Sequence, residues 1–318
     1  MLEYIELGKD IYIVKETRTR VNILNSILIE EEDAILIDAN YPFETIDELY
    51  KRLNNHARAL IISHCHTDHM AHAFYHQELY DTALLCPEQE KSHILSLDSL
   101  MQDVGFIDMG LVETFKMMAY QYMKFREAKN VDTFNPGETL HYFSVEIETI
   151  HIPGHSPGHT AFIIRSVLND HNRKILFVSD IGSHPYYGDL YCNLNDYYTS
   201  LDKLEKIYFS SDFILVPAHG TIYLEKDEEF FQRIRQRIQR NKERVLQTLS
   251  KSEPKSIREM VFQGILTPTN KMNPSIKDLY LLWDGGMVLQ HIKELIEQGL
   301  AEKVEEKNIL DDKYILVN

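Results

Sequence analysis

The chain has 318 residues, of which 44% are hydrophobic and 26% charged, a balance that is typical of a globular protein and excludes a disordered one. Its three cysteines are too few, and odd in number, for a disulfide framework, which indicates a reducing compartment. The net charge of −16 is held entirely by residues 1–219, because residues 220–318 carry equal numbers of acidic and basic side chains. An acidic N-terminal part disfavours nucleic acid as a partner, although bound metal cations would change the sign locally.

The N-terminal sequence MLEYIELGKD has neither the basic region nor the apolar stretch of a secretory signal. No run of the sequence approaches the ~20 apolar residues that a membrane helix needs. We therefore expect a cytoplasmic protein that does not insert into a membrane.

Short β-branched runs, split by charged or turn residues, fill the first sixty residues. These runs predict strands at 11–14, 22–29, 34–38 and 59–63. A helical pattern over 45–53 separates the last two strands. Strand, helix and strand followed by a polar loop is the arrangement in which α/β folds place their chemistry.

The next segment, about 88–132, is rich in methionine and compatible with helices. It predicts two or three helices inserted between core elements. Two interpretations stay open for its methionines. They pack in the core, or they form a flexible lid or an apolar substrate wall, since methionine adapts to irregular apolar ligands.

The rest of the N-terminal part returns to strands, at 139–152, 160–166, 174–179 and 213–217, with a helical pattern at 196–208. From about residue 224 the residue pattern becomes that of an amphipathic helix. One face of this helix is apolar, and the opposite face over 233–244 is basic. Further helices are predicted at 256–263 and 286–299, and strands at 301–306 and 312–317. This order predicts a winged-helix-like domain over 223–318, following a catalytic domain over 1–222.

The run His64-Cys65-His66-Thr67-Asp68-His69 directly follows the apolar strand 59–63. In an extended segment alternate side chains project the same way, so His64 and His66 can meet one ion while Cys65 points elsewhere. Where the chain turns, Asp68 and His69 can face a second ion close by. Neutral imidazoles and carboxylates suit zinc best, and they also accept iron or manganese.

Two ions need more ligands than this run supplies, and further candidates follow other predicted strands. His155 and His159 lie in the turn sequence PGHSPGH, Asp180 ends the strand 174–179, and His219 follows the strand 213–217. Because each lies where a strand meets its loop, these side chains can converge on one edge of the sheets.

With these landmarks in this order, the chain resembles the metallo-β-lactamase superfamily. The superfamily motif H-x-H-x-D-H stands here as HCHTDH, and it is accompanied by LIDAN, PGHSPGH, VSD and PAHG over about residues 10–222. The resemblance implies an α/β fold, the four-layer αβ/βα sandwich. The chain resembles glyoxalase II-like members, and its length and helical insertion are similar to those of thioesterase-like members. Its tail resembles the winged-helix extension of the β-lactamase-like-2 group.

The resemblance also implies two divalent ions and a ligand set. The ligands of the first ion would be His64, His66 and His155. Those of the second would be Asp68, His69 and His219. Asp180 would bridge the two ions, while Asp38 and His159 would orient ligands from behind.

A di-metal centre activates water at neutral pH, so the predicted reaction is hydrolysis, with Asp68 and Asp180 as catalytic carboxylates. We expect a small-molecule ester or thioester, such as an acyl-CoA, a glutathione-type thioester or a lactone. A phosphodiesterase or ribonuclease is the alternative within the superfamily. A metal-containing regulatory or binding protein is the alternative outside catalysis.

Two interpretations stay open for each of three further features of the sequence. Tyr186, Tyr187 and Tyr191 follow Asp180, where they donate a hydrogen bond to a substrate oxyanion or only shape the loop. The basic face at 233–244 is a solvated or domain-contact face, or it touches nucleic acid. The apolar tail packs on its own chain or on a second copy in a homodimer.

Overall fold

The computed structural model describes residues 1–17, 24–167, 173–190 and 192–317. Two main sheets are built from these residues. The strands of the first sheet follow chain order: β1 (Leu2–Gly8), β2 (Ile11–Glu16), β3 (Asn25–Ile29), β4 (Ile35–Ile37), β5 (Ala59–Ile61), β6 (Ala83–Pro87) and β7 (Val131–Phe134). Strands β1 to β4 pair antiparallel, and β4 to β7 pair parallel. The loops after β4, β5 and β6 therefore leave the sheet at the same edge.

The second sheet has the order β12-β11-β10-β9-β8. Its strands are β8 (Thr139–Tyr142), β9 (Val145–His151), β10 (Thr160–Ser166), β11 (Lys174–Ser179) and β12 (Phe213–Pro217). Because β11 and β12 are parallel, the residues that follow them, Asp180 and His219, also leave from one edge. The stretch predicted as one strand at 139–152 is a hairpin of β8 and β9.

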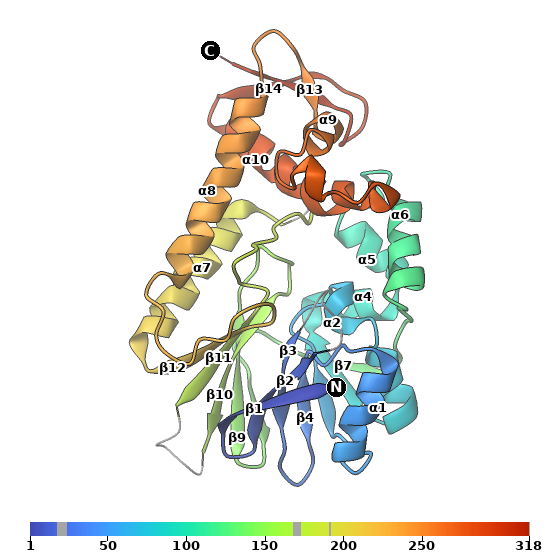
Figure 1. Cartoon of the computed structure of the whole chain (residues 1–318), viewed down its shortest axis with the longest axis vertical. Coiled ribbons are helices and arrows are strands. Elements are labelled where there is room, and N and C mark those ends of the chain that lie inside the picture. The colour runs from blue at the N-terminus through green and yellow to red at the C-terminus, as the bar shows by residue number, and fades with distance from the viewer. Residues whose placement is uncertain (18–23, 168–172, 191, 318) are drawn as a thin grey trace.

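Alternation along the strands of the second sheet creates two apolar faces. In β11, Ile175 and Phe177 join the core between the sheets, whereas Leu176 and Val178 pack with α7 (Leu194–Ser210) and α8 (Phe230–Thr248). On the far side lie α1 (Phe43–Arg52) and α3 (Ala73–Tyr80), which together with α7 and α8 enclose the two sheets (Figure 1). This is the predicted four-layer αβ/βα sandwich.

The methionine-rich segment is helical over most of its length. Its elements are η1 (Glu88–Glu90), α4 (Lys91–Leu95), α5 (Leu97–Asp103), α6 (Val112–Met117) and the π-helical η2 (Met118–Tyr122). The predicted end at residue 132 was wrong, because Val131 and Asp132 already belong to β7 and pair with Leu84 and Leu85 of the sheet. The insertion therefore leaves the sheet after β6 and returns to it directly.

In its described residues, the C-terminal segment contains the predicted helices and strands, together with one strand and three short helices that were not predicted. After α8 come β13 (Lys255–Ser256), α9 (Ile257–Phe262), η3 (Thr269–Lys271), η4 (Pro274–Ile276), the π-helical η5 (Leu281–Gly285), α10 (Gly286–Glu297), β14 (Ala301–Glu305) and β15 (Lys313–Leu316). Ser256 and Glu259 form a capping box that begins α9. The strands form a small sheet in the order β13-β15-β14. Helix α10 lies across the end of the sandwich, between α8 and α6 (Figure 1).

Within the described ranges, no helix combines the length and the apolar character that crossing a membrane requires.

Candidate metal centre

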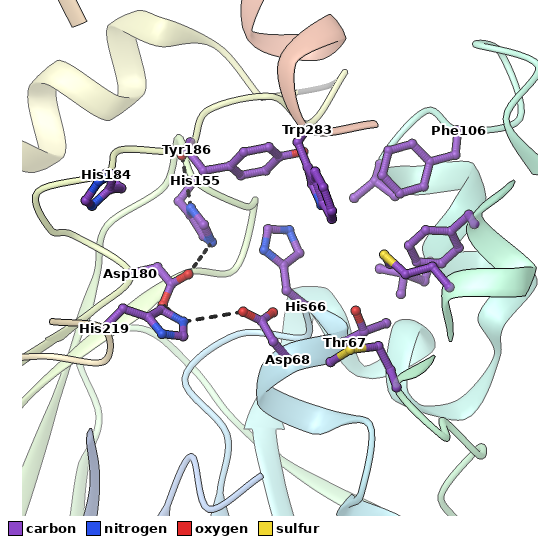
Figure 2. A pocket seen from close by; sticks show the side chains of 15 residues that line it. His66, Thr67, Asp68, Phe106, His155, Asp180, His184, Tyr186, His219 and Trp283 are labelled. Carbon is purple, nitrogen blue, oxygen red and sulfur yellow. Dashed lines mark hydrogen bonds and ion pairs between the residues drawn. The ribbon is translucent and has the colours of Figure 1, made fainter. Parts of the chain in front are cut away.

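The structure brings all seven predicted ligands together at the shared edge of the two sheets. They form two groups, and within each group the ligand atoms lie within 4.8 Å of one another. The first group is His64, His66 and His155. The second group is Asp68, His69, Asp180 and His219. Figure 2 shows side chains of both groups pointing toward one another from the loops that follow β5, β9, β11 and β12.

The local backbone explains how one short run serves both groups. His66 is extended, with φ −75° and ψ 150°, and it precedes the short helix α2 (Thr67–Met70). His64 and His66 therefore project from extended chain, while Asp68 and His69 project from the first helical turn. The His219 loop is held to the first sheet by Asn25, whose Nδ2 donates to the carbonyl oxygens of Pro217 (2.7 Å) and Gly220 (3.2 Å).

A buried network behind the run fixes the protonation of His64. Asp38 accepts hydrogen bonds from the backbone N–H of Ser63 (2.8 Å) and from its hydroxyl (2.6 Å). The Ser63 hydroxyl has only one proton and donates it to the Asp38 carboxylate. In the contact between the two serines (2.6 Å), the Ser179 hydroxyl must therefore be the donor and Ser63 Oγ the acceptor. No hydroxyl proton is left for Nδ1 of His64, 3.1 Å from Ser63 Oγ, so this nitrogen donates. Nε2 of a neutral His64 therefore carries a lone pair.

The same reasoning applies to His155. Its Nδ1 lies 3.0 Å from the carbonyl oxygen of Tyr186, which only accepts, so Nε2 of the neutral ring carries the lone pair. The two Nε2 atoms of His64 and His155 face each other at 3.0 Å. Burial, together with neighbouring histidines, keeps the pKa of both rings below its ordinary value. Two lone pairs that face each other repel, and a cation bound by both removes the repulsion. The first group therefore fits a metal ion.

Asp180 lies between the two groups. Its Oδ2 is 3.4 Å from His155 Nε2, and its Oδ1 is 2.9 Å from His69 Nε2. His69 donates from Nδ1 to Asp38 (3.0 Å), so its Nε2 lone pair points at a carboxylate oxygen unless a cation intervenes. Both atoms are buried, and neither has a hydrogen-bond partner in the described part of the chain. Burial opposes protonation of His69, but the three carboxylates of Asp180, Asp38 and Asp68 raise its pKa well above the ordinary value. The second group thus also fits a cation.

Asp68 and His219 complete the second group. His219 Nε2 lies 3.3 Å from Asp68 Oδ2 and 3.6 Å from Asp180 Oδ1. Burial works to raise the pKa of Asp68, but the neighbouring His69 and His219 lower it to about 2. Asp68 is therefore ionised at neutral pH, in the form that binds a metal ion.

Two buried residues behind the ligands were predicted, and a third was missed. Asp38 binds His69, as described above, and Nε2 of His159 accepts the backbone N–H of Asp180 (3.3 Å). The missed residue is Glu90, which is fully buried. It accepts from the backbone N–H of Cys65 (2.5 Å), the hydroxyl of Ser156 (2.5 Å) and the N–H of Gly158 (2.7 Å), and so ties the HCHTDH loop to the PGHSPGH loop.

Asp189 is the second missed residue. It is buried, and its Oδ2 lies 3.0 Å from Nε2 of His66. Burial opposes protonation of His66, but Asp189 raises the pKa of this imidazole to about 9. The loop of Asp189 is held by α10, because Gln290 Nε2 donates to the carbonyl oxygens of Asp189 (3.1 Å) and Cys192 (2.8 Å). At Gly286 the helix touches the loop so closely that a Cβ atom would lie 1.8 Å from the carbonyl oxygen of Gly188.

Five of the seven ligands form the floor of a pocket of about 440 Å³: His66, Asp68, His155, Asp180 and His219. One wall is apolar and combines the methionine-rich segment with the tail: Leu100, Val104, Phe106, Phe115, Met118, Met123 and Trp283. Met101 and Met109 are buried in the core, as one interpretation of the methionines predicted, while Met118 and Met123 line this wall. A role of this segment as a lid or against a substrate stays a prediction. Trp283 reaches the pocket from η5 (Figure 2).

The three tyrosines after Asp180 differ in position. Tyr186 lines the pocket, and burial together with Asp189 raises the pKa of its hydroxyl. Of the two interpretations left open for Tyr187, the structural one fits, because its buried hydroxyl lies 2.8 Å from His291 Nε2 and accepts from Asn241 (3.0 Å), which links α8 and α10. Tyr191 lies outside the described residues.

Comparison with known proteins agrees with this geometry. The sequence profile of the metallo-beta-lactamase superfamily matches residues 19–219. The hydroxyacylglutathione hydrolase GloC of Haemophilus influenzae is 23% identical over 202 residues, which cover 60% of this chain and 82% of that protein.

Two solved structures share the fold over nearly the whole chain, tail included. A metallo-beta-lactamase family protein from Thermus thermophilus has a TM-score of 0.74 and 15% identity, covering 98% of this chain and 100% of that one. A beta-lactamase domain protein from Burkholderia ambifaria has a TM-score of 0.72 and 15% identity, covering 99% of this chain and 94% of that one. With the matched profile, the fold and the His/Asp clusters in place, the chain belongs to the metallo-β-lactamase superfamily.

Proposed function

We propose that this superfamily hydrolase cleaves an ester or thioester whose acyl group is apolar. The observation that carries the proposal is the position of the two ligand groups on the floor of a pocket whose adjoining wall is apolar. The name of the Haemophilus influenzae relative, a hydroxyacylglutathione hydrolase, adds support for a thioester. The apolar wall would hold the acyl group by excluding water, and the ligand groups would lie beneath the scissile carbonyl.

The residues assigned to one ion are His64, His66 and His155. Those assigned to the other are Asp68, His69 and His219. Asp180 has one oxygen toward each group, which is the arrangement a bridging ligand needs. Imidazole and carboxylate ligands favour zinc, with iron or manganese as alternatives. When bound, two such ions lower the pKa of a shared water and polarise the substrate oxygen.

The side chains of this chain have three tasks in the proposed reaction. His64 and His155 stay neutral in their buried setting, so their Nε2 lone pairs remain available as ligands. Asp68 is ionised and partly exposed to the pocket, so it can accept the proton of the attacking water. Asp38, Ser63 and Ser179 hold the tautomer of His64 by their chain of hydrogen bonds.

The test is metal analysis of the purified full-length chain, followed by a hydrolysis panel with the metal found. The panel contains p-nitrophenyl esters of increasing acyl length, acyl-CoA and acyl-glutathione thioesters, a lactone, bis(p-nitrophenyl) phosphate and single-stranded RNA. We expect turnover of esters or thioesters that rises with acyl length, because a longer chain covers more of the apolar wall. A phosphodiester cleaved faster than every acyl substrate would contradict the proposal.

Two variants and a control locate the activity. His66→Ala and Asp180→Ala should abolish turnover while the circular dichroism spectrum stays that of the parent. His141→Ala is the matched control, since this histidine is exposed on β8 and belongs to neither ligand group. Full activity in His66→Ala would contradict the ligand assignment.

The fold of the C-terminal segment and the compartment of the protein are also proposals. We infer a winged-helix-like tail from the order of α8, α9, α10 and the hairpin of β14 and β15. A reducing compartment is supported by the free state of Cys65, Cys86 and Cys192, all of which are buried. The homodimer stays a prediction.

A further inference from the structure

A second pocket, of about 350 Å³, opens beside the candidate metal centre. Its lining comes from the loop after Asp180, the chain before α8, and α8 itself: Ser183, His184, Tyr223, Phe230, Arg233, Ile234, Gln236, Arg237 and Arg240. His184 also lines the first pocket, so the two cavities adjoin at this side chain. We call the second cavity the arginine pocket.

The three arginines of this pocket differ in their carboxylate partners. Arg233 forms ion pairs with Asp227 and with Glu229. In contrast, no ion pair to Arg237 or Arg240 is found in the part of the chain that the structure describes. Residues three apart on a helix are neighbours, so these two guanidinium groups present adjacent positive charge to the cavity. Both arginines belong to the basic face over 233–244, in a C-terminal part whose net charge is zero.

The arginine pocket and the apolar wall lie on opposite sides of the ligand groups. Figure 2 shows Phe106 and Trp283 on one side, His184 on the other, and Asp68, Asp180 and His155 between them. A substrate that spans this site would place an apolar part against Phe106 and Trp283. The part on the other side of its scissile bond would reach the arginine pocket.

We propose that the arginine pocket binds the phosphate groups of the leaving group, so that the substrate is an acyl thioester of a phosphorylated thiol of the coenzyme A class. This inference rests on the proposed function. Guanidinium groups pair with phosphate and carboxylate oxygens alike, but a terminal phosphate carries up to two negative charges on three acceptor oxygens. Two adjacent arginines therefore fit phosphate better than a single carboxylate. In the reaction, water oxygen bonds to the acyl carbon, the C–S bond breaks, and one water proton ends on the leaving thiol.

Binding separates the contribution of the phosphates from that of the thiol. Isothermal titration of the metal-loaded full chain compares coenzyme A with pantetheine, which has the same thiol but neither the phosphates nor the adenosine, and the arginine variants below assign the difference to the phosphates. We expect coenzyme A to bind at least about 10-fold more tightly, with the difference shrinking as salt is raised. The double variant Arg237→Ala/Arg240→Ala should reduce coenzyme A affinity by about 10- to 100-fold.

Two further variants keep the result interpretable. Arg244→Ala removes the same charge from the same helix outside the arginine pocket, so it should preserve the preference for coenzyme A. Arg237→Lys/Arg240→Lys keeps the charge but loses the planar fork, and it should restore part of the affinity. With acyl thioesters of the two thiols, the ratio of their KM values should fall toward one in the double alanine variant and stay unchanged in Arg244→Ala.

Several results would overturn the proposal. Equal affinity for coenzyme A and pantetheine would contradict a phosphate site. So would a loss of coenzyme A affinity in Arg244→Ala that equals the loss in the double alanine variant. Tighter binding of glutathione than of coenzyme A would assign the leaving group to a different class. Cleavage of single-stranded RNA that depends on Arg237 and Arg240, without coenzyme A binding, would assign the pocket to nucleic acid. Coenzyme A binding that depends on these arginines without hydrolysis of any thioester would refute the proposed function and leave the phosphate site intact.

Discussion

Oδ2 of Asp189 lies 3.0 Å from Nε2 of His66, and this contact decides which nitrogen of His66 is left for a metal ion. A carboxylate only accepts, so Nε2 carries the proton and Nδ1 of the neutral ring carries the lone pair. A histidine held by a carboxylate in this way has a fixed ring orientation and a more basic ligand nitrogen. The first ligand group therefore depends on a residue 123 positions further along the chain.

Replacing Asp189 should weaken metal binding at the first group. We expect Asp189→Ala to lower metal affinity by about 10- to 100-fold, the usual effect of losing a partner behind a metal ligand. Asp189→Asn should lose less metal affinity, because the amide oxygen of asparagine still accepts the hydrogen bond from His66. Competition against a chromogenic chelator measures both affinities. The matched control is Asp132→Asn at an exposed position of β7, and an equal loss in that variant would contradict the role of Asp189.

Glu90 should matter for stability as well as for the site. In Glu90→Gln one acceptor oxygen becomes an NH2 group that faces an N–H or hydroxyl donor, and a buried donor without an acceptor costs about 1–3 kcal/mol. We expect the free energy of unfolding in urea to fall by this amount, together with metal affinity. Glu88→Gln, two residues earlier and exposed, should stay near the parent value. Parent-like stability of Glu90→Gln would mean that the two loops are held together by other contacts.

Trp283 should set acyl selectivity from the tail. Because its ring faces the pocket, Trp283→Ala should lower kcat/KM for long-chain esters about 10-fold or more, and that for acetate esters much less. The ratio of the two values, measured over a series of p-nitrophenyl esters, is the readout. Phe143→Ala removes an exposed aromatic side chain that is not part of the pocket lining and serves as the control. An unchanged ratio in Trp283→Ala would exclude the tail from substrate recognition.

His76 should make the fold sensitive to acid. It is fully buried, with Nε2 2.9 Å from the carbonyl oxygen of Ala39 and Nδ1 3.0 Å from the Tyr50 hydroxyl. Burial lowers its pKa from 6.5 to about 3. Between these values the unfolded chain binds more protons than the folded chain, so stability falls as pH falls below 6.5.

The expected loss from His76 between pH 6.5 and pH 5 is about 1.5 kcal/mol. His76→Gln cannot gain this proton, so the difference in unfolding free energy between parent and variant should shrink or reverse as pH falls. Urea unfolding at several pH values, in saturating metal, gives this difference. Parallel pH profiles for the two proteins would show that His76 does not contribute to acid sensitivity.

The sequence predicted that the seven candidate ligands lie close together, because each follows an apolar strand. Strand ends are local features, and parallel strands bring their ends to one edge, so His64 and Asp180 could be placed together without a structure. Asp38 and His159 were predicted from the superfamily resemblance and are found against the same groups.

Residues whose role depends on contacts between distant segments could not be predicted in this way. Asp189 stands in a loop without periodicity, and Glu90 looks like any charged residue at the start of a helical insertion. Trp283 belongs to the C-terminal segment, which the sequence pattern predicts to be a separate domain. For Tyr187 the sequence left two interpretations open, because proximity in sequence to Asp180 does not show which side of the loop its ring occupies. Only the packing of α8 and α10 decides that orientation.

The close approach of Gly286 to Gly188 has a consequence for regulation. Helix α10 and the loop of Asp189 touch through backbone atoms, and neither has a side chain there that could absorb a shift. Any displacement of α10 is therefore passed on to the loop that carries both Asp189, the partner of His66, and the pocket-lining Tyr186. A ligand or protein that moved the tail would act as an allosteric effector of the metal centre without entering either pocket.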